Sequence, residues 1–506
     1  MRSPGGSFLS YFLQSSFLQS SVFAAFLLSS LAIGQAPPWG QSLSFGGPGS
    51  DWGSVVKVDR RANKYVAGYF TGTVTFGTRT LTSAGDVDGY IMKFRSDGSF
   101  GWAVRLGGPG YDQAFDIGFD GNENVYVAGS LSGTATFESV HGAIQTINGS
   151  GNCMFLAKYD PSGDLQWVQI GVSDFGSNNE GFGVAVNPAS GMIYMVGRAS
   201  GSITFTSLNG RHCKLSNGDT DWHGYLVKYD TAGNCQWAEQ DAAGGNSIAH
   251  KVAIDSANNA YLVGWFEGSI TFSSRDGKTQ TVQAYSPTGD DPYPDDAFVT
   301  KYNSSGDLQW INHIGGWKGI ANDVAVSPTA GNVTITGFIG NINTGDSRAE
   351  TLVSSQPPGA TINLGGGDFS YDIVLATYDG AGVVQSASRI GGKDTDDGSG
   401  VAYDAAGNLY VAGLFGNTVD FGGITLNGAG PNNLFVLKFT GSTLDWAKMA
   451  PGGATQNLEN DSRLAVNSST GKVFVTGAYT GSAIFGGTTL TSAGQEDIFL
   501  ATIPPE

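Results

Sequence analysis

One segment recurs along this chain at nearly constant spacing, and this repetition constrains the fold more than any other feature. The first copy is VAGYFTGTVTF at residues 66–76, and later copies include VAGSLSGTATF at 127–137 and LVGWFEGSITF at 262–272. The first glycines of the copies are Gly68, Gly129, Gly197, Gly264, Gly337, Gly413 and Gly477. Their spacing indicates seven repeats of about 68 residues each.

Each repeat contains the pattern of four strands. In the second repeat AFDIGFD (114–120) alternates in polarity, and GNENVYVAG (121–129) follows a tight Asn- and Gly-rich turn. A third, buried stretch resembles GYIMKF (89–94), and the repeat closes with a turn and a Trp strand such as DPSGDLQWVQI (160–170). The intervening GTVTF segment predicts an extra hairpin or a long loop. An acidic or amide residue precedes the third strand in most repeats: Asp88, Asp221, Asp296, Asp372, Asn433 and Asp497.

Four antiparallel strands in each of seven repeats predict an all-β fold, a seven-bladed β-propeller, because one blade cannot bury both of its faces alone. The two ends of the repeat array support closure of the ring. WGQSLSFGG (39–47) aligns with the closing strand WAVRLGG (102–108), whereas DIFLATI (497–503) stops after a third strand. The N-terminal strand is therefore expected to complete the last blade, a velcro closure that removes a sheet edge.

The stretches DGNENVYVAG (120–129), KYDPSGDLQW (158–167) and the trailing GG resemble the bacterial SBBP family of seven-bladed β-propeller repeats, over nearly all of the chain after its N-terminus. The resemblance implies an exported or surface protein and implies no particular reaction. Ser386 departs from the pattern at a closing Trp, and Thr377 and Thr502 depart from it at the Lys of KY.

The recurring tryptophans have two interpretations, an aromatic ligand cage or packing between blades. Because they recur at one place in every blade but one, we interpret them as structural. They are Trp39, Trp102, Trp167, Trp237, Trp310 and Trp446.

Composition and charge limit the classes of function. The chain has 77 glycines, 14% charged and 40% hydrophobic residues, which is typical of many turns around a substantial core. The formal net charge of -18 opposes binding to nucleic acid and to anionic lipid surfaces.

The N-terminus predicts export. Residues 1–36 have the pattern of a signal peptide, with the apolar run VFAAFLLSSLAIG at 22–34, although an uncleaved anchor is the alternative. No later apolar stretch is long enough to span a membrane, so we expect residues 37–506 to form one propeller domain, secreted or at the cell surface, and monomeric.

Three cysteines are too few for a disulfide scaffold. Cys213 and Cys235 fall in one repeat and could pair, leaving Cys153 unpaired, and buried free thiols are the alternative.

GGPGYDQAF (107–115) and GGPGSDWGS (46–54) match the repeat of a calcium-binding β-roll. That roll needs tandem copies, whereas these copies are about 61 residues apart, which is one blade. We interpret them as glycine-rich links between blades, in which Asp51 and Asp112 accept hydrogen bonds from backbone amides.

No motif of catalysis is present in the sequence. It contains neither G-x-S-x-G nor H-E-x-x-H. KYDPSGDLQW departs in spacing from the Trp-docking motif of PQQ-dependent dehydrogenases, and SDGSFGW (96–102) departs from the Asp-box of sialidases. Carboxylates that meet at the axial mouth of the propeller remain the basis of an alternative, a polysaccharide hydrolase or lyase.

Two acidic loops are the candidate sites. GDDPYPDD (289–296) lies in a long insertion, and its ligand-binding candidates are Tyr285, Asp290, Asp291, Tyr293 and Asp295. GKDTDDGSG (392–400) supplies oxygen ligands of the kind that calcium prefers, from Asp394, Asp396 and Asp397. No cofactor other than calcium is expected.

The sequence as a whole favours a non-enzymatic binding module that recognises a protein or glycan partner through loops on one face. A polysaccharide hydrolase or lyase and a structural surface or adhesion spacer are the alternatives.

Overall fold

The structure is a computed structural model. It describes residues 35–175, 179–216, 220–285, 294–315, 318–340, 350–355, 358–365, 370–450 and 463–506. One compact unit spans Ala36–Glu506. The expected signal peptide at 1–36 lies almost wholly outside the described residues. All regular secondary structure in the described residues is β-strand, which confirms the all-β class.

The strands pair into four-stranded antiparallel groups, one for each sequence repeat, which we number repeat 1 to repeat 7 along the chain. The first strands are β2 (Trp52–Val58), β8 (Gln113–Phe119), β12 (Glu180–Val186), β19 (Ser247–Ile254), β25 (Lys318–Val326), β31 (Asp397–Tyr403) and β37 (Leu464–Val466). The second strands are β3 (Lys64–Phe70), β9 (Val125–Glu138), β13 (Ile193–Ser200), β20 (Ala260–Glu267), β26 (Val333–Gly340), β32 (Leu409–Phe415) and β38 (Val473–Phe485). The third strands are β6 (Asp88–Phe94), β10 (Ile144–Tyr159), β16 (Trp222–Tyr229), β23 (Asp295–Tyr302), β29 (Tyr371–Tyr378), β35 (Asn433–Thr440) and β39 (Thr488–Ile503). The fourth strands are β7 (Phe100–Gly107), β11 (Leu165–Ser173), β17 (Cys235–Gln240), β24 (Leu308–Gly315), β30 (Val384–Ile390), β36 (Thr443–Ala450) and, in repeat 7, β1 (Ser42–Phe45).

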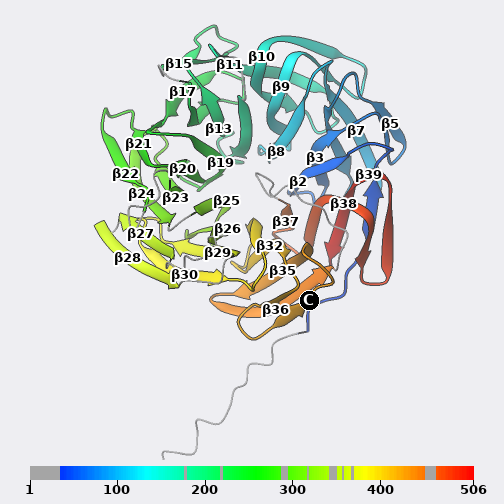
Figure 1. The fold of residues 1–506 in the computed structure, drawn as a ribbon. Coiled ribbons are helices and arrows are strands. Elements are labelled where there is room, and N and C mark those ends of the chain that lie inside the picture. Colours follow the sequence, from blue (N-terminus) through cyan, green and yellow to red (C-terminus); the bar gives the residue numbers. More distant parts are fainter. Residues whose placement is uncertain are drawn as a thin grey trace, which may run out of the picture. The chain divides into compact units, whose positions relative to one another are not determined.

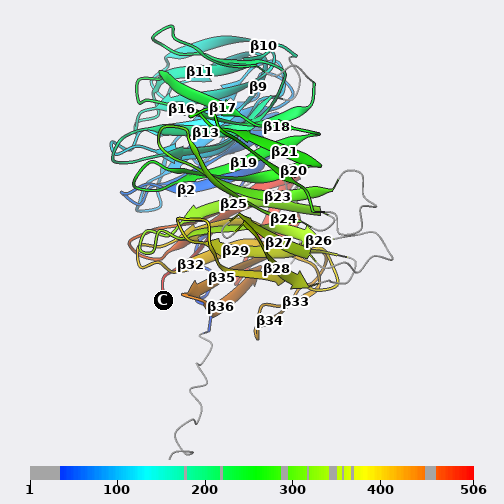
Figure 2. The same ribbon diagram turned by 90° about the vertical axis from the view of Figure 1, so that its left-hand side faces the viewer.

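The first strands lie next to one another around a common centre. Each contacts the first strand of the following repeat, in the order β2, β8, β12, β19, β25, β31 and β37, and β37 in turn contacts β2. Figure 1 shows the sheets succeeding one another around this centre in sequence order, and Figure 2 shows the same sheets from the side.

β1 belongs to repeat 7 although it precedes every other strand in the sequence. It pairs with β39 from Ser42 opposite Ala501 to Phe45 opposite Ile498. The pairing corrects the alignment of Trp39 with Trp102. Gln41 accepts a hydrogen bond from the Thr502 N–H at 3.0 Å, and it therefore holds the place of a closing tryptophan.

Trp39 instead lies before β1 and has a different role. Its Nε1 donates to the Met449 carbonyl at 3.0 Å, and its ring meets Phe485 edge-on at 5.1 Å. Both stretches begin with Trp and end in GG, but the first is two residues longer, so aligning the two tryptophans placed Trp39 two positions out of register.

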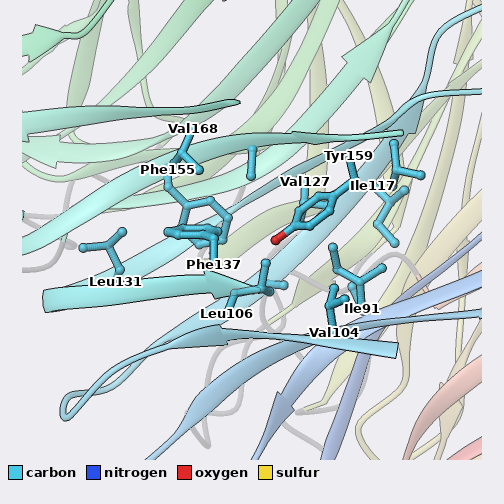
Figure 3. Close-up of a cluster of buried hydrophobic side chains, with 14 of the residues drawn as sticks. Ile91, Val104, Leu106, Ile117, Val127, Leu131, Phe137, Phe155, Tyr159 and Val168 are labelled. Carbon is cyan, nitrogen blue, oxygen red and sulfur yellow. The ribbon is translucent and has the colours of Figure 1, made fainter. Parts of the chain in front are cut away.

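The core lies between neighbouring repeats. Figure 3 shows one such layer, in which Ile91 and Val104 of repeat 1 face Ile117, Val127 and Tyr159 of repeat 2, all of them buried. Burial of each such side chain contributes about 1.5–3 kcal/mol, so the interfaces between repeats carry most of the hydrophobic stabilisation.

The GTVTF segments form hairpins, one of the two predicted outcomes. They are β4 (Thr73–Phe76) with β5 (Arg79–Thr82), β14 (Ile203–Phe205) with β15 (Cys213–Leu215), β21 (Ser269–Ser273) with β22 (Thr279–Gln283), β27 (Glu350–Ser355) with β28 (Pro358–Gly365), and β33 (Thr418–Asp420) with β34 (Thr425–Asn427). In repeats 2 and 7 the second and third strands extend to form the hairpin. Several hairpins pair with residues at the outer edge of the preceding repeat: β9 with β7, β14 with β11, β27 with β24, and β21 with β18 (Ala242–Ala243). This pairing covers exposed sheet edges.

A disulfide joins Cys213 of one hairpin to Cys235 of β17, with the Cα atoms 6.0 Å apart. Of the two alternatives left open by the sequence, the structure has the paired one. Cys153 is a buried free thiol.

The closing tryptophans lie at the joints between repeats. Five of them are buried and meet a tyrosine of their own second strand at 5.9–6.3 Å: Trp102, Trp167, Trp237, Trp310 and Trp446. In repeats 1 to 4 the lysine of the KY or KF pair lies over the same tyrosine ring at 5.1–5.2 Å. Tyrosine, lysine and tryptophan therefore form one repeated cluster.

The lysine and the tryptophan of this cluster donate hydrogen bonds to a single backbone carbonyl of the next repeat. Lys93 Nζ and Trp102 Nε1 both donate to the Pro161 carbonyl, at 2.8 and 3.2 Å. The Thr231 carbonyl receives the same two donors from repeat 2, and the Gly380 carbonyl receives them from repeat 4. Each accepting carbonyl lies in the turn between the third and fourth strands.

Repeat 5 replaces the whole cluster rather than one member of it. Thr334, Thr377 and Ser386 stand at the places of the tyrosine, lysine and tryptophan. Thr334 Oγ1 lies 2.7 Å from Thr377 Oγ1 and 2.6 Å from the hydroxyl of Tyr403 on the next repeat. The departures noted in the sequence are therefore concerted.

Acid–base pairs join the third and fourth strands. Arg105 bonds Asp88 at 2.7 Å, and His313 bonds Asp296 at 2.5 Å. In repeat 3 the register places His223, not Asp221, at the position of Asp88, and its partner is Asp241 at 3.4 Å. The polarity of the pair is reversed there, and Asp221, which directly precedes β16, is not the equivalent of Asp88.

Candidate functional site

Two faces of the repeat array are candidate binding surfaces. The turn face carries the turns between first and second strands, such as residues 59–63, and the turns between third and fourth strands. The loop face is the opposite one, where first and third strands begin and second strands end.

A cavity of about 340 Å³ opens at the centre of the turn face. Its wall includes apolar residues from the first strands of successive repeats, among them Val58, Phe119, Val186, Val252 and Val324. Charged side chains also line it, namely Lys57, Asp59, Arg60, Asp120 and Glu123.

The carboxylates of this mouth are engaged in their own turns. Asp59 accepts the N–H groups of Arg61 and Asn63, and Asp120 accepts those of Asn122 and Asn124. Burial works to raise the pKa of Asp120, but hydrogen bonds from Asn124, Asn122 and Tyr126 outweigh it and lower that pKa. A general acid at neutral pH needs a raised pKa, so Asp120 is suited to capping its turn.

Further along the axis, buried charges tie neighbouring first strands together. Asp116 accepts the Val184 N–H at 3.1 Å, and the ammonium groups of Lys251 and Lys57 lie 3.6 and 3.9 Å from its oxygens. Asp323 similarly accepts the Val401 N–H at 2.9 Å. These contacts cross from one repeat to another, which favours a structural role for the axial charges.

β-Bulges turn side chains toward the loop face and the axis. Six first strands in the described residues have a bulge at the same position, at Ser54, Phe115, Phe182, His250, Asn322 and Ser399. Phe115 and Phe182 meet edge-to-face at 5.2 Å, and Phe182 lies 6.1 Å from the His250 ring. Bulges of this kind re-aim side chains out of the regular alternation.

An aromatic arc follows on the loop face across repeats 1 to 3. We define it by Trp52, Tyr69, Tyr111, Phe115, Phe182 and Trp222. Trp52 stacks on Tyr69 with an interplanar angle of 3°, and Tyr69 lies 6.5 Å from Tyr111. Trp222 and the partly buried Trp265 pack against Phe115, Phe182 and Ile248.

Arg198 provides the polar group of the arc. Its guanidinium lies 4.1 Å above the Trp222 ring and 5.5 Å from the Phe182 ring, and it bonds Glu180 at 2.6 Å. The Tyr111 ring is 51% exposed, and burial followed by the charge of Glu180 raises the pKa of its hydroxyl. Trp52, Phe115 and Phe182 are buried. The accessible aromatic surface of the arc is therefore that of Tyr69, Tyr111 and Trp222, beside a fixed cation and carboxylate.

The predicted binding loop lies partly outside the described residues, because Asp290, Asp291 and Tyr293 fall there. Tyr285 is half-buried, and its N–H donates to Asp296 Oδ2 at 2.9 Å. Asp295 begins β23 on the loop face, with Lys318 Nζ 4.0 Å from its carboxylate.

The three calcium candidates make separate contacts. Asp394 accepts a hydrogen bond from Asn417 at 3.0 Å, Asp397 accepts one from Asn322 at 2.9 Å, and Asp396 accepts the N–H groups of Gly392 and Gly416. Within the described ranges, no group of three or more His, Cys, Asp or Glu residues is placed to hold a metal ion. Calcium binding stays a prediction, which melting temperatures measured with calcium and with chelator would test.

The sequence did not single out the aromatic arc. Tyr69, Arg198 and Trp265 all follow the glycine of the VAG motif, as do Ser130 and Phe338. The repeats vary at this position while their flanks stay alike, and a comparison of the seven copies would have identified it as a surface that differs from blade to blade.

One segment of the chain matches a family profile. Residues 101–130, which span β7, β8 and the start of β9, match the family profile SBBP, described as a beta-propeller repeat. This segment is therefore similar to an SBBP repeat. It contains Trp102 and the glycine-rich link that follows it, so the expected resemblance to β-propeller repeats is confirmed for this segment.

Other similarities are more distant. An uncharacterized WD repeat-containing protein of Acanthamoeba polyphaga mimivirus is 24% identical over 250 residues, covering 44% of this chain and 17% of the viral protein. The match therefore spans less than a fifth of that relative's length. Extracellular domains of a candidate one-component system and a candidate hybrid two-component system from B. thetaiotaomicron are 10% and 9% identical. They cover 91% and 92% of this chain and 73% and 82% of theirs, and both TM-scores are 0.16, which supports no argument about the fold.

Among the residues that the structure describes, no helix is long and apolar enough to cross a membrane.

Proposed function

We propose that this protein is an exported seven-bladed β-propeller, closed by its N-terminal strand, that binds a protein or glycan partner through the loop face. The circular order of contacts among first strands and the pairing of β1 with β39 support the closed ring. The family match and the WD-repeat relative support an interaction module rather than an enzyme.

The aromatic arc is the observation that carries the binding proposal. Aromatic and arginine side chains are enriched at the energetic centres of interfaces, and on this face Tyr111 lies beside Tyr69 and Arg198 lies over Trp222. Tyr285 and Asp295, the described candidates of the predicted binding loop, lie on the same face. Export is supported by the disulfide, because such bonds persist in oxidising compartments.

A binding screen tests the proposal. Residues 37–506 are applied to a glycan array and to a library of purified extracellular proteins, and each hit is measured again with Trp222→Ala and Tyr111→Ala. Loss of a central aromatic residue is expected to weaken binding by about tenfold or more.

Ile144→Ala serves as the matched control, because Ile144 is 67% exposed but lies on the β10 hairpin, outside the arc. Hits that bind the two arc variants and the control with equal affinity would contradict the assignment of the loop face.

A further inference from the structure

A cavity distinguishes the joint between repeats 6 and 7. It measures about 490 Å³ and opens on the turn face, away from the aromatic arc. Tyr410, Lys438 and Trp446 of repeat 6 line it, together with the turn at 468–471 and residues 504–506. Its volume lies within the range of small-ligand sites.

At other joints a turn carbonyl fills the corresponding place. The carbonyls of Pro161, Thr231 and Gly380 each accept hydrogen bonds from the lysine and the tryptophan of the preceding repeat. In repeat 7 the third strand ends at Ile503, and its neighbour β1 comes from residues 42–45. No turn joins these two strands, and the cavity lies where that turn would be.

A carboxylate takes the place of the turn carbonyl. Lys438 Nζ donates to Glu506 Oε2 at 2.8 Å, and Trp446 Nε1 donates to Glu506 Oε1 at 2.5 Å. One donor therefore meets each oxygen, a geometry that selects a carboxylate over a single carbonyl. The Glu506 side chain is 51% exposed, whereas that of Lys438 is 11% exposed, so the acceptor is the accessible member of the pair.

The remaining lining is mixed. Asn408, Ser468, Ser469 and Thr470 contribute amide and hydroxyl groups, Tyr410 contributes a ring, and alanine and proline residues contribute apolar surface. Two further acids are close. Asp445 lies 3.5 Å from Lys438 Nζ, and Asp404 lines the cavity but accepts the N–H groups of Ala406 and Asn408 in its own turn. A sugar acid presents one carboxylate, several hydroxyls and an apolar ring face, which match this mixed lining.

We propose that the joint between repeats 6 and 7 is a binding site for hexuronates, with the ligand carboxylate held by Lys438 and Trp446 in the place of Glu506. Glu506 is then an internal competitor, and it lowers the apparent affinity by the fraction of molecules in which it occupies the site. This site is separate from the loop face and does not depend on the function proposed for that face.

Calorimetric titration with D-galacturonate tests the site. The Glu506→Ala variant is expected to bind about fivefold to tenfold more tightly than the unmodified chain, because the competing carboxylate is gone. Adding Lys438→Met to that variant is expected to abolish binding. Lys301→Met is the matched control. Lys301 is the equivalent lysine at the joint between repeats 4 and 5, where its Nζ donates to the Gly380 carbonyl of a turn. D-galactose, which lacks the carboxylate, is expected not to bind.

Three results would overturn the proposal. In the first, Glu506→Ala keeps its melting temperature but does not bind galacturonate at about 10 mM ligand. In the second, adding Lys438→Met leaves the binding of galacturonate unchanged. In the third, N-acetylalanine binds more tightly than galacturonate. The last result would assign the pocket to peptide carboxyl termini. Titration of the unmodified chain at the same concentrations tests the site even where a variant fails to fold.

Discussion

The aspartate of the glycine-rich link makes the same kind of hydrogen bonds in several repeats. Asp51 accepts the N–H groups of Gly47 and Thr71, and Asp112 accepts those of Gly108 and Ser132. These bonds were predicted from the sequence and are confirmed. Asp396 makes the same pair of contacts in repeat 6, so a residue selected as a calcium candidate also caps a link.

Burial gives these carboxylates an unusual effect on stability. It raises the pKa of Asp51 and Asp112 to about 6 and that of Asp396 to about 7, against the opposing effect of the backbone donors. Between pH 3.8 and these values the folded chain binds more protons than the unfolded chain. Their contribution to stability is therefore fully present below pH 3.8 and is lost as pH rises through about 6 to 7.

Asp396→Asn tests this pH dependence. We expect the free energy of unfolding to fall less between pH 5 and pH 8 in the variant than in the unmodified chain, by roughly 1–3 kcal/mol, because one shifted carboxylate is removed. Asparagine is compatible with such a link, since Asn179 accepts the Ser200 N–H at 3.2 Å. Urea unfolding at the two pH values measures the difference, and parallel pH profiles would show that the pKa of Asp396 is not raised.

Residue roles could be predicted where local chemistry decides them. The glycine-rich spacing predicts the bonds of Asp51 and Asp112 to Gly47 and Gly108, because donor and acceptor are four positions apart. The bonds to Thr71 and Ser132 span twenty positions and depend on the strand pairing. The role of Trp39 depended on the register of β1 against β39, whose residues are more than 400 positions apart. The trailing GG agrees with that register and the tryptophan does not, so aligning the tryptophans gave the wrong position. His223 was missed for a related reason, because its pairing with Asp241 reverses the polarity seen in other repeats.

At the scale of the element, the turn between the third and fourth strands requires glycine at one position, because of its backbone conformation and its contact with a tryptophan. Gly382 has φ +87°, and a Cβ there would lie 2.8 Å from the Trp310 ring of the preceding repeat. Gly163 and Gly233 also have positive φ. A Cβ at Gly163 would lie 2.8 Å from the Trp102 ring, and one at Gly233 would lie 3.2 Å from the Trp167 ring. The GxLQW pattern thus couples a turn conformation to a joint between repeats.

Gly382→Ala is expected to destabilise the fold by about 2–4 kcal/mol, because backbone strain at positive φ adds to overpacking against Trp310. Gly441→Ala is the control, since Gly441 also has positive φ but a Cβ there would meet no atom within 4 Å. We expect that variant to cost about 1 kcal/mol, from the backbone alone. Equal losses in denaturant unfolding would show that contact with the tryptophan contributes nothing.

The order of strands within a repeat could be predicted because polarity alternates along each of them and turn residues separate them. The same signals could not predict the aromatic arc. Phe115 and Phe182 reach it through β-bulges, which break the alternation that a sequence pattern relies on. The cavity at Lys438 was also hidden, because it depends on which strand pairs with β39.

For the whole molecule, the pairing of β1 with β39 determines how the repeats cooperate. In an open array each repeat is stabilised by its neighbours, and the terminal repeats have one neighbour fewer. Phe45 of β1 contacts Phe76 and Phe94 of repeat 1, with ring centroids at 6.2 and 5.6 Å. β1 is therefore hydrogen-bonded to β39 within repeat 7 and also packs against the core of repeat 1.

Removal of residues 1–47 tests this role. Without β1 the outer edge of β39 is unpaired and the hydrophobic layer around Phe45 is opened, so we expect a lower melting temperature and unfolding in more than one step. Calorimetry measures this as a van't Hoff enthalpy that falls below the calorimetric enthalpy. Phe45→Ala, which keeps the strand, is expected to lose about 3–5 kcal/mol while the transition stays single. A truncated chain that unfolds in one step at an unchanged temperature would mean that repeats 1 and 7 are not coupled through β1.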